Sequence, residues 1–244
     1  FAQKAIGRSF WKDYPDLPRI QKHDLARYRE WADQKLYLTG ADKGETPTWD
    51  WLFEKFNEQM FAYGIDIFVI DAFNKVQLAK GNKLDEIGAV LTRLTAFAQA
   101  NDVVVFLVAH PTKMKKNEKT GQYDSPTLYD VSGSADFRNQ THDGYCIYRN
   151  FASDGHEGYT TFTNLKTKYQ FQGEIGANSE FEYHIPTGRY YVRGGSPPLF
   201  DMTLPMSEQQ LPPPKQSALQ PNTNFYEPIT ETNENEPDPF DPPF

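Results

Sequence analysis

Two short apolar runs decide the fold: residues 65–71 read IDIFVID, and residues 103–110 read VVVFLVAH. Neither run alternates strictly between apolar and polar residues, which is typical of strands buried on both faces of a parallel sheet. Between them an apolar face repeats at helical spacing and predicts a helix. Its members are Ile87, Val90, Leu91, Leu94, Phe97 and Ala98. Strand, helix and strand in this order predict a right-handed βαβ unit with ligand chemistry at the carboxyl ends of the strands.

The flanking sequence predicts further elements on both sides of this unit. Upstream, a helix over 24–35 and a short strand at 36–38 precede a helix that starts at Pro47, after a Thr46 N-cap, and ends at Gly64. Downstream, a polar loop (111–130) leads to three segments that predict antiparallel strands extending the same sheet. These segments are 145–150, 159–166 and 181–192. The predicted fold class is α/β.

The chain of 244 residues carries a formal net charge of −8 that is unevenly spread. Residues 195–244 contain eight acidic residues, one basic residue and 12 of the 18 prolines, without apolar periodicity. Such a segment cannot bury enough surface to offset the entropy of ordering. We therefore expect a globular domain over 1–194 that is nearly neutral and a disordered acidic tail over 195–244.

The cysteine content and the length of the apolar runs indicate the cellular compartment of the protein. The single cysteine, Cys146, excludes an internal disulfide and a Cys-based zinc site, which favours a reducing cytoplasm. No apolar run approaches the roughly 18 residues of a membrane span, so we expect no membrane partner. The chain opens on FAQKAIGRSF, which has neither the charge nor the apolar core of a signal peptide, and we expect it to begin inside a domain.

The first run ends in an acid, Asp71, after four apolar residues. This is the shape of a Walker B segment, whose acid holds Mg²⁺ directly or through water beside nucleotide phosphates. The alternative is an aspartate that caps the following turn, because any parallel strand that ends in Asp has this appearance.

The second run ends in His110. The tip of the strand beside a Walker B strand is where a nucleotide-hydrolysing fold places a sensor of the γ-phosphate, since an imidazole there can hydrogen-bond one nucleotide state and not the other. The alternative is a histidine whose ring is satisfied by loop carbonyls.

Basic and amide side chains crowd the segments that follow. Such groups bind phosphate backbones without reading sequence, so a flexible basic loop near a nucleotide sensor suits contact with a polyanion. The alternative is a set of merely solvated charges. The residues are Lys113, Lys115, Lys116 and Lys119 in the loop, and Arg138, Asn139 and Gln140 after a Ser-Gly-Ser segment.

Four segments, in this order and spacing, carry a resemblance to a known family. They are IDIFVIDAFNKVQ (65–77), FAQANDVVVFLVAHPTKM (97–114), SPTLYDVSGSADFRNQTHDGYCIYRN (125–150) and LKTKYQFQGEIGANSEFEYHIPTGRYY (165–191). Together they resemble the C-terminal half of the RecA-like replicative DNA helicases of the DnaB superfamily, in the branch of phage primase-helicases and Twinkle. The resemblance covers about residues 1–193. It implies a P-loop NTPase core that uses ATP or another NTP with Mg²⁺, assembles into hexameric rings and translocates on single-stranded DNA.

The resemblance also implies roles for individual residues. Asp71 is similar to the Walker B acid that holds Mg²⁺, and His110 to the γ-phosphate sensor. Lys113 and the loop after it resemble the DNA loop of the central channel. Arg138 and Asn139 stand in the polar motif that follows.

A departure from the family occurs at Lys166-Thr167-Lys168, which resembles a Lys-x-Arg motif. The arginine of that motif is a finger that reaches the neighbouring subunit's nucleotide, and here Lys168 replaces it. A lysine offers a point charge without the planar fork that bridges two phosphate oxygens. Either Lys168 is a weaker finger, or the charge comes from Lys166 or from Arg149, which matches a basic position at the end of an earlier strand.

The larger departure is an absence. No G-x-x-x-x-G-K-[ST] motif occurs in residues 1–244, and neither does the family's catalytic glutamate. Without phosphate-cradling amides, we expect this chain not to bind ATP well by itself. Family members carry both features upstream, so we expect truncation rather than loss. The alternatives are a non-catalytic RecA-like module that binds or loads onto DNA, and a RecA-fold ATPase of repair or plasmid replication.

The end of the chain reads NENEPDPFDPPF (233–244). It resembles the acidic tip of bacterial single-stranded DNA-binding proteins. We expect Phe244 to fill an apolar pocket on a replication partner while nearby carboxylates meet basic side chains, or the tip to fold back on the basic loop. The alternative is a tail that only adds solubility. A bacterial or phage-infected cytoplasm is the expected location.

Overall fold

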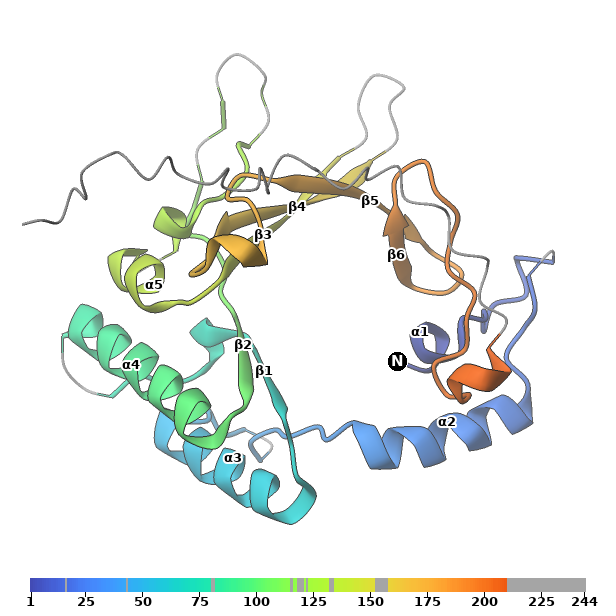
Figure 1. The fold of residues 1–244 in the computed structure, drawn as a ribbon, viewed down its shortest axis with the longest axis horizontal. Coiled ribbons are helices and arrows are strands. Elements are labelled where there is room, and N and C mark those ends of the chain that lie inside the picture. The colour runs from blue at the N-terminus through green and yellow to red at the C-terminus, as the bar shows by residue number, and fades with distance from the viewer. Residues whose placement is uncertain are drawn as a thin grey trace, which may run out of the picture. The chain divides into compact units, whose positions relative to one another are not determined.

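A computed structural model describes residues 1–15, 17–42, 44–79, 82–114, 116–117, 121, 123–131, 134–151 and 158–209 (Figure 1). The chain divides into two compact units, Phe1–Thr203 and Leu204–Phe244. In the second unit the described part contains one 3-10 turn, η4 (Met206–Glu208).

In the first unit, helices alternate with the first two strands, and the last four strands follow α5. The helices are α1 (Ala2–Ile6), α2 (Lys22–Lys35), α3 (Trp49–Tyr63), α4 (Lys83–Asn101) and α5 (Ser134–Gln140), with 3-10 turns η1 (Phe73–Lys75), η2 (Leu128–Asp130) and η3 (Gln170–Gln172). The strands are β1 (Ile67–Asp71), β2 (Val104–Val108), β3 (Gly144–Asn150), β4 (Tyr159–Lys166), β5 (Asn178–His184) and β6 (Arg189–Val192).

The predicted βαβ unit is present. Strands β1 and β2 pair in parallel, with Ile67 opposite Val104 and Asp71 opposite Val108, and α4 forms the connection. Antiparallel strands β3 to β6 follow, as expected, so the α/β fold class is confirmed.

One expected detail of the sheet is wrong in the described part of the chain: β3–β4–β5–β6 form a sheet of their own instead of extending β1–β2. The segment after β2 folds into η2 and α5, and α5 packs against α4 before β3 begins. The four antiparallel strands pair in sequence order. One face of this sheet exposes Tyr145, Ile147, Tyr183, Tyr190 and Val192.

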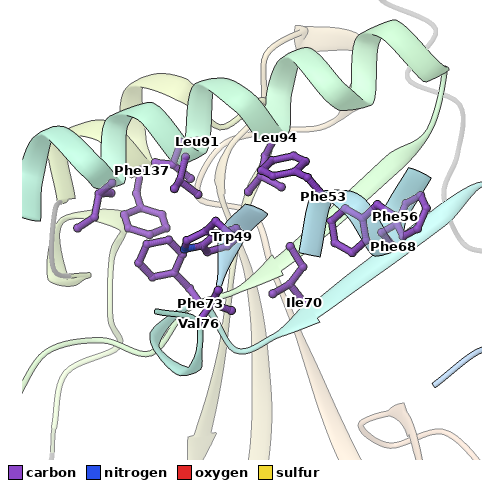
Figure 2. Packing of buried hydrophobic residues seen from close by; sticks show 12 residues of the cluster. Trp49, Phe53, Phe56, Phe68, Ile70, Phe73, Val76, Leu91, Leu94 and Phe137 are labelled. Carbon is purple, nitrogen blue, oxygen red and sulfur yellow. The ribbon is translucent and has the colours of Figure 1, made fainter. Parts of the chain in front are cut away.

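The hydrophobic core lies between α3, α4 and the β1–β2 pair (Figures 1 and 2). Figure 2 shows Leu91 and Leu94 pointing from α4 toward aromatic side chains of α3. Aromatic rings from different elements pack against one another. The ring centroids of Phe56 (α3) and Phe68 (β1) are 4.5 Å apart, and those of Phe73 (η1) and Phe137 (α5) are 5.1 Å apart. The buried members are Trp49, Phe53, Phe56, Phe68, Ile70, Phe73, Val76, Ile87, Val90, Leu91, Leu94 and Phe137.

The expectation that β1 and β2 are buried on both faces is wrong for the described chain. Alternate residues of β1 are exposed, with Ile67 at 57% and Val69 at 64%, and β2 exposes Val104, Phe106 and Val108. The register places these side chains on one face. Helices α3 and α4 lie on the other face (Figure 1), so the face with Ile67 and Val69 is left uncovered by the residues that the structure describes.

The upstream boundaries also differ from the prediction. Helix α3 begins at Trp49 with Thr48 as its N-cap, because Thr48 is extended and bridges to Gln77, whose backbone N–H donates to the carbonyl oxygen of Pro47. Its end at Gly64, with φ 64°, agrees with the prediction. The expected strand at 36–38 is absent, since within the described ranges no strand runs beside it to pair with its backbone.

The segment expected to open the acidic tail is packed instead. Residues 195–203 lie in the first unit, where the buried Asp201 accepts hydrogen bonds from Arg27 Nη2 (2.6 Å) and Thr203. Arg27 also binds Asp24, a fully buried carboxylate on α2 that Arg8 holds from the other side at 2.9 Å. This ion network joins α2 to the chain beyond β6. Residues 210–244, including Phe244, lie outside the described residues.

A buried arginine completes this junction. Arg189, at the start of β6, donates hydrogen bonds to the carbonyl oxygens of Lys4 (2.6 Å), Ala5 (3.0 Å) and Pro198 (2.8 Å). The contacts with Lys4 and Ala5 reach carbonyls at the end of α1 that have no partner inside the helix. Burial lowers the pKa of Arg189, and the negative charge of Asp201 acts in the opposite direction.

Candidate functional site

The predicted phosphate-facing residues lie at one edge of the parallel pair. Asp71 ends β1 opposite Val108, and His110 follows Val108 by two residues on the neighbouring strand. Both side chains are exposed, and Asp71 continues the uncovered side of β1 after Ile67 and Val69. The structure therefore brings the Walker B-like acid and the strand-tip histidine to the same carboxyl edge.

A cavity of about 200 Å³ opens beside His110. Its polar lining includes two residues that sequence reasoning missed, Asn74 on η1 and Lys83 at the start of α4. Asn74 follows Asp71 by three residues, so its nearness to a strand end was a usable signal. The apolar lining consists of Phe73, Val76, Leu78, Ile87, Ala109 and Val131.

The donor set at this edge fits Mg²⁺ only together with a nucleotide. Within the described residues, no group of three or more His, Cys, Asp or Glu side chains could hold a metal ion. Protein sites for Mg²⁺ in nucleotide enzymes often supply one or two carboxylates, and substrate phosphates supply other ligands. Asp71 is a suitable single carboxylate of that kind.

The basic loop is anchored at its base. The backbone N–H and the hydroxyl of Thr112 both donate to the carbonyl oxygen of Asp130, at 2.7 and 2.9 Å, and Pro111 bridges to Val131. Lys113 is exposed directly beyond this anchor.

Further along the loop, Lys116 bridges to Tyr123, and its Nζ lies 5.6 Å from the centroid of that ring. Lys115 and Lys119 lie outside the described residues. The described lysines therefore occupy one loop whose two ends are held together.

Helix α5 brings a second basic group to this loop. The guanidinium of Arg138 lies 5.0 Å from the ring centroid of Tyr129, on η2 at the loop's end. Asn139 is the next exposed residue on α5. Hydrogen bonds from the backbone and hydroxyl of Thr127 hold the pKa of Asp130 below its ordinary value. They favour the ionised carboxylate of Asp130, the residue that follows Tyr129 in η2. Arg138 and the loop base thus form one polar surface.

Lys166 is engaged inside the fold. Its Nζ donates to the carbonyl oxygens of Arg138 (2.5 Å), Asn139 (3.3 Å) and Thr141 (2.6 Å), at and just beyond the C-terminal end of α5. Burial lowers the pKa of Lys166, and the nearby charge of Arg138 acts in the same direction. An ammonium held by three carbonyls is a helix cap, and in this arrangement its hydrogen bonds are made within the chain.

The other two finger candidates lie far apart. Lys168 is exposed just beyond the end of β4, where Lys166 pairs with Gly144, whereas Arg149 pairs with Thr160 near the start of β4. Six residues of strand separate these two ends, a span of about 20 Å. The structure does not bring Lys168 and Arg149 together.

Comparisons with known proteins agree with the resemblance seen in the motifs. No protein-family model matches the chain. The Twinkle homolog protein, chloroplastic/mitochondrial, of Arabidopsis thaliana is 27% identical over 196 residues, which covers 77% of this chain and 27% of that protein. The chain therefore spans about a quarter of the length of this curated relative. This similarity supports the likeness to the Twinkle branch of the DnaB-like helicases.

Among solved structures, the chain is similar to the ATPase domain of G40P. The TM-score is 0.47 at 17% sequence identity, and the match covers 59% of this chain and 51% of that one. Within the described ranges, none of the helices combines the length and the apolar character needed to cross a bilayer.

Proposed function

We propose that this chain is the C-terminal part of the RecA-like ATPase core of an NTP-driven, ring-forming DNA helicase. The observation that carries the proposal is the position of Asp71 and His110 at the same carboxyl edge of two adjacent parallel strands. An acid that binds Mg²⁺ and a neighbouring group that responds to the γ-phosphate are the two functions that such an edge supplies in nucleotide hydrolysis.

The uncovered face of β1–β2 supports the idea that a further segment completes the site. Parallel sheets occur almost only where both faces are covered, and here Ile67, Val69 and Phe106 are exposed on one face. Asp71 lies on that same face. A segment that carries the phosphate-cradling loop would cover these apolar side chains. The same segment would hold the phosphates of a bound nucleotide near Asp71.

In this proposal the residues divide the chemistry between two subunits. Asp71 would hold Mg²⁺, which would supply positive charge beside the phosphates, and His110 would hydrogen-bond the γ-phosphate before hydrolysis. Lys168, exposed beyond β4, would place its ammonium near the nucleotide of an adjacent subunit. Lys166 holds the end of α5 and is not proposed as a finger.

Single-stranded DNA is the proposed polymer ligand. Lys113, Lys116, Arg138 and Asn139 present cationic and amide groups on the anchored loop and on α5, a set suited to phosphate backbones. The loop follows His110 directly, so a change at the γ-phosphate could be transmitted to the DNA contact through Pro111 and Thr112. A homo-hexameric ring and contact of the acidic tail with replication proteins, in a bacterial or phage-infected cytoplasm, are further parts of the proposal.

A strand-displacement assay tests the function. We expect a form of the protein extended to include a P-loop to unwind a forked DNA only in the presence of NTP and Mg²⁺. We also expect Lys168→Ala subunits mixed with unaltered subunits to lower the rate more than their fraction predicts, because a finger acts on its neighbour's nucleotide. An extended protein that binds DNA but does not hydrolyse NTP would contradict the proposal.

A second function is a non-catalytic module that binds or loads onto DNA. The observation in its favour is that residues 1–244 contain no phosphate-cradling motif. DNA binding without NTP dependence, in the extended protein as well as in the chain alone, would support this second function.

A further inference from the structure

An exposed aromatic ring lies beside two of the cations that the proposed function places at DNA phosphates. Tyr129 on η2 is 60% exposed, and the guanidinium carbon of Arg138 lies 5.0 Å from its ring centroid. Lys113 follows Thr112, whose backbone N–H donates at 2.7 Å to the carbonyl oxygen of Asp130, the residue after Tyr129. The ring and both cations therefore lie at the base of one loop.

The turn that carries Tyr129 is held by hydrogen bonds and by packing. The backbone N–H of Tyr129 donates to the hydroxyl of Thr127 at 3.2 Å, and the hydroxyl of Thr127 donates to the Asp130 carboxylate at 2.8 Å. Leu128 packs against the start of β3, where its Cδ1 would lie 2.8 Å from a Cβ added at Gly144. Tyr129 is thus exposed on a bonded backbone, although an aromatic ring gains free energy from burial.

The surroundings of this ring match a nucleotide unit of single-stranded DNA. A base can stack on the exposed surface of Tyr129 while phosphates on either side of it are attracted to Arg138 and Lys113. The Asp130 carboxylate accepts hydrogen bonds from the backbone N–H and hydroxyl of Thr127, so this negative charge is already engaged. A purely apolar protein partner would gain nothing from the two cations and would have to desolvate them.

A second ring in the same loop is paired with a cation in the same way. Tyr123 is 47% exposed, and the Nζ of Lys116 lies 5.6 Å from its ring centroid. The hydroxyl of Tyr148, on β3, donates to the backbone carbonyl oxygen of Tyr123 and ties this part of the loop to the sheet. Exposed rings beside cations are typical of surfaces that bind single strands.

We propose that Tyr129 is a platform on which an unpaired base of single-stranded DNA stacks. This inference rests on the proposed function and adds a base contact to it, distinct in chemistry from the phosphate contacts of Lys113 and Arg138. Every base has a flat face, so the platform adds affinity without sequence preference.

Fluorescence anisotropy with two labelled probes tests the platform in the full chain. One probe is an oligothymidine of about 12 nucleotides, and the other is an abasic strand of the same length that keeps the phosphates and lacks the bases. We expect Tyr129→Ala to weaken binding of oligothymidine at least about fivefold, because one stacked base is lost. Binding of the abasic strand stays within about twofold, and the log–log salt slope is unchanged, because the phosphate contacts remain.

Three further variants separate stacking from other effects. Tyr129→Phe keeps the flat ring and binds oligothymidine like the unaltered chain. Tyr129→Leu keeps an apolar side chain beside Arg138 without a flat ring, and shows the same selective loss as Tyr129→Ala. The matched control is Phe61→Ala, which removes a ring 84% exposed on α3 and leaves both affinities unchanged.

The outcomes separate this inference from the proposed function. If Tyr129→Ala weakens both probes equally and flattens the salt slope, Tyr129 only positions Arg138, and the platform is wrong while the proposed function stands. Salt-dependent binding of both probes that Tyr129→Ala does not alter also overturns the platform and leaves the proposed function standing. No binding of either probe by the unaltered chain contradicts both.

Discussion

The ammonium nitrogen of Lys166 lies 2.5 Å from the carbonyl oxygen of Arg138, a residue 28 positions earlier in the chain. This bond ties the end of β4 to the end of α5. Because Lys168 follows on one side and Asn139 on the other, the residues proposed to meet a neighbour's nucleotide and those proposed to meet DNA share one rigid support.

Lys166→Met tests this support. Methionine keeps much of the length of the side chain but donates no hydrogen bond, so the carbonyls of Arg138, Asn139 and Thr141 lose their shared donor. We expect the free energy of unfolding to fall by about 1–3 kcal/mol and amide exchange to rise across 134–143. Lys168→Met is the matched control, since Lys168 is exposed two residues away. Equal effects of the two changes would show that Lys166 is an ordinary surface lysine.

Asp24 makes the stability of the fold depend on pH. Burial acts to raise the pKa of this carboxyl, but hydrogen bonds from the Gln21 amide and from Arg27, with the charge of Arg8, hold it below 3.8. A lowered pKa in the folded state means that the contribution is present above pH 3.8 and is lost as the pH falls through the folded value.

We therefore expect Asp24→Asn to cost about 3 kcal/mol near pH 6 and progressively less below pH 3.8. Chemical denaturation of both proteins at a series of pH values measures the difference. Asp33→Asn, on the exposed side of α2, is the control and should show no such convergence. A cost that is constant down to pH 2 would refute the linkage.

Gly7 allows the close approach that closes the first unit. Its φ is +75°, and a Cβ added there would lie 2.8 Å from both Arg189 Nη1 and the carbonyl oxygen of Phe200. We expect Gly7→Ala to lower the free energy of unfolding by about 1–3 kcal/mol, measured by denaturant titration. Gly40→Ala is the control, because no atom lies within 4 Å of its added Cβ. Equal stability of the two variants would contradict the observed packing.

Lys113→Ala and Arg138→Ala test the phosphate contacts. If each side chain neutralises one phosphate, each change should weaken binding of single-stranded DNA and flatten the log–log salt dependence by about 0.7 to 1. Affinity titrations between low and moderate salt measure the slope. Lys35→Ala, at the exposed end of α2, should leave it unchanged. Unaltered slopes in both variants would show that Lys113 and Arg138 are solvated charges that do not contact DNA phosphates.

The βαβ unit was predictable because its signals are local. Apolar runs at 65–71 and 103–110 and a helical repeat between them suffice to place Asp71 and His110 at one edge, since parallel strands end together. Their burial on both faces was not predictable in this way. An apolar sequence shows that a strand is suited to burial on both faces, but not which segment covers each face. In the described chain no segment covers the second face of β1 and β2.

The cap on α5 could not be predicted from the sequence. Lys166 and Arg138 belong to separate elements, and their contact depends on how α5 packs against the sheet. The motif Lys166-Thr167-Lys168 suggested that either lysine could be a finger, whereas the structure engages one and leaves the other exposed. The packing of Asp201 was hidden for a similar reason: its partner Arg27 lies 174 residues away.

ATP turnover is the measurement that tests the central claim most directly. It compares the 244-residue chain with the same chain extended to include a P-loop, with and without Asp71→Ala. Asp66→Ala, at the opposite end of the same strand, is the control. We expect no turnover by the chain alone, turnover stimulated by single-stranded DNA in the extended protein and in its Asp66→Ala variant, and none in Asp71→Ala. Strong turnover by the 244 residues alone, or full activity of the extended Asp71→Ala variant, would contradict the account.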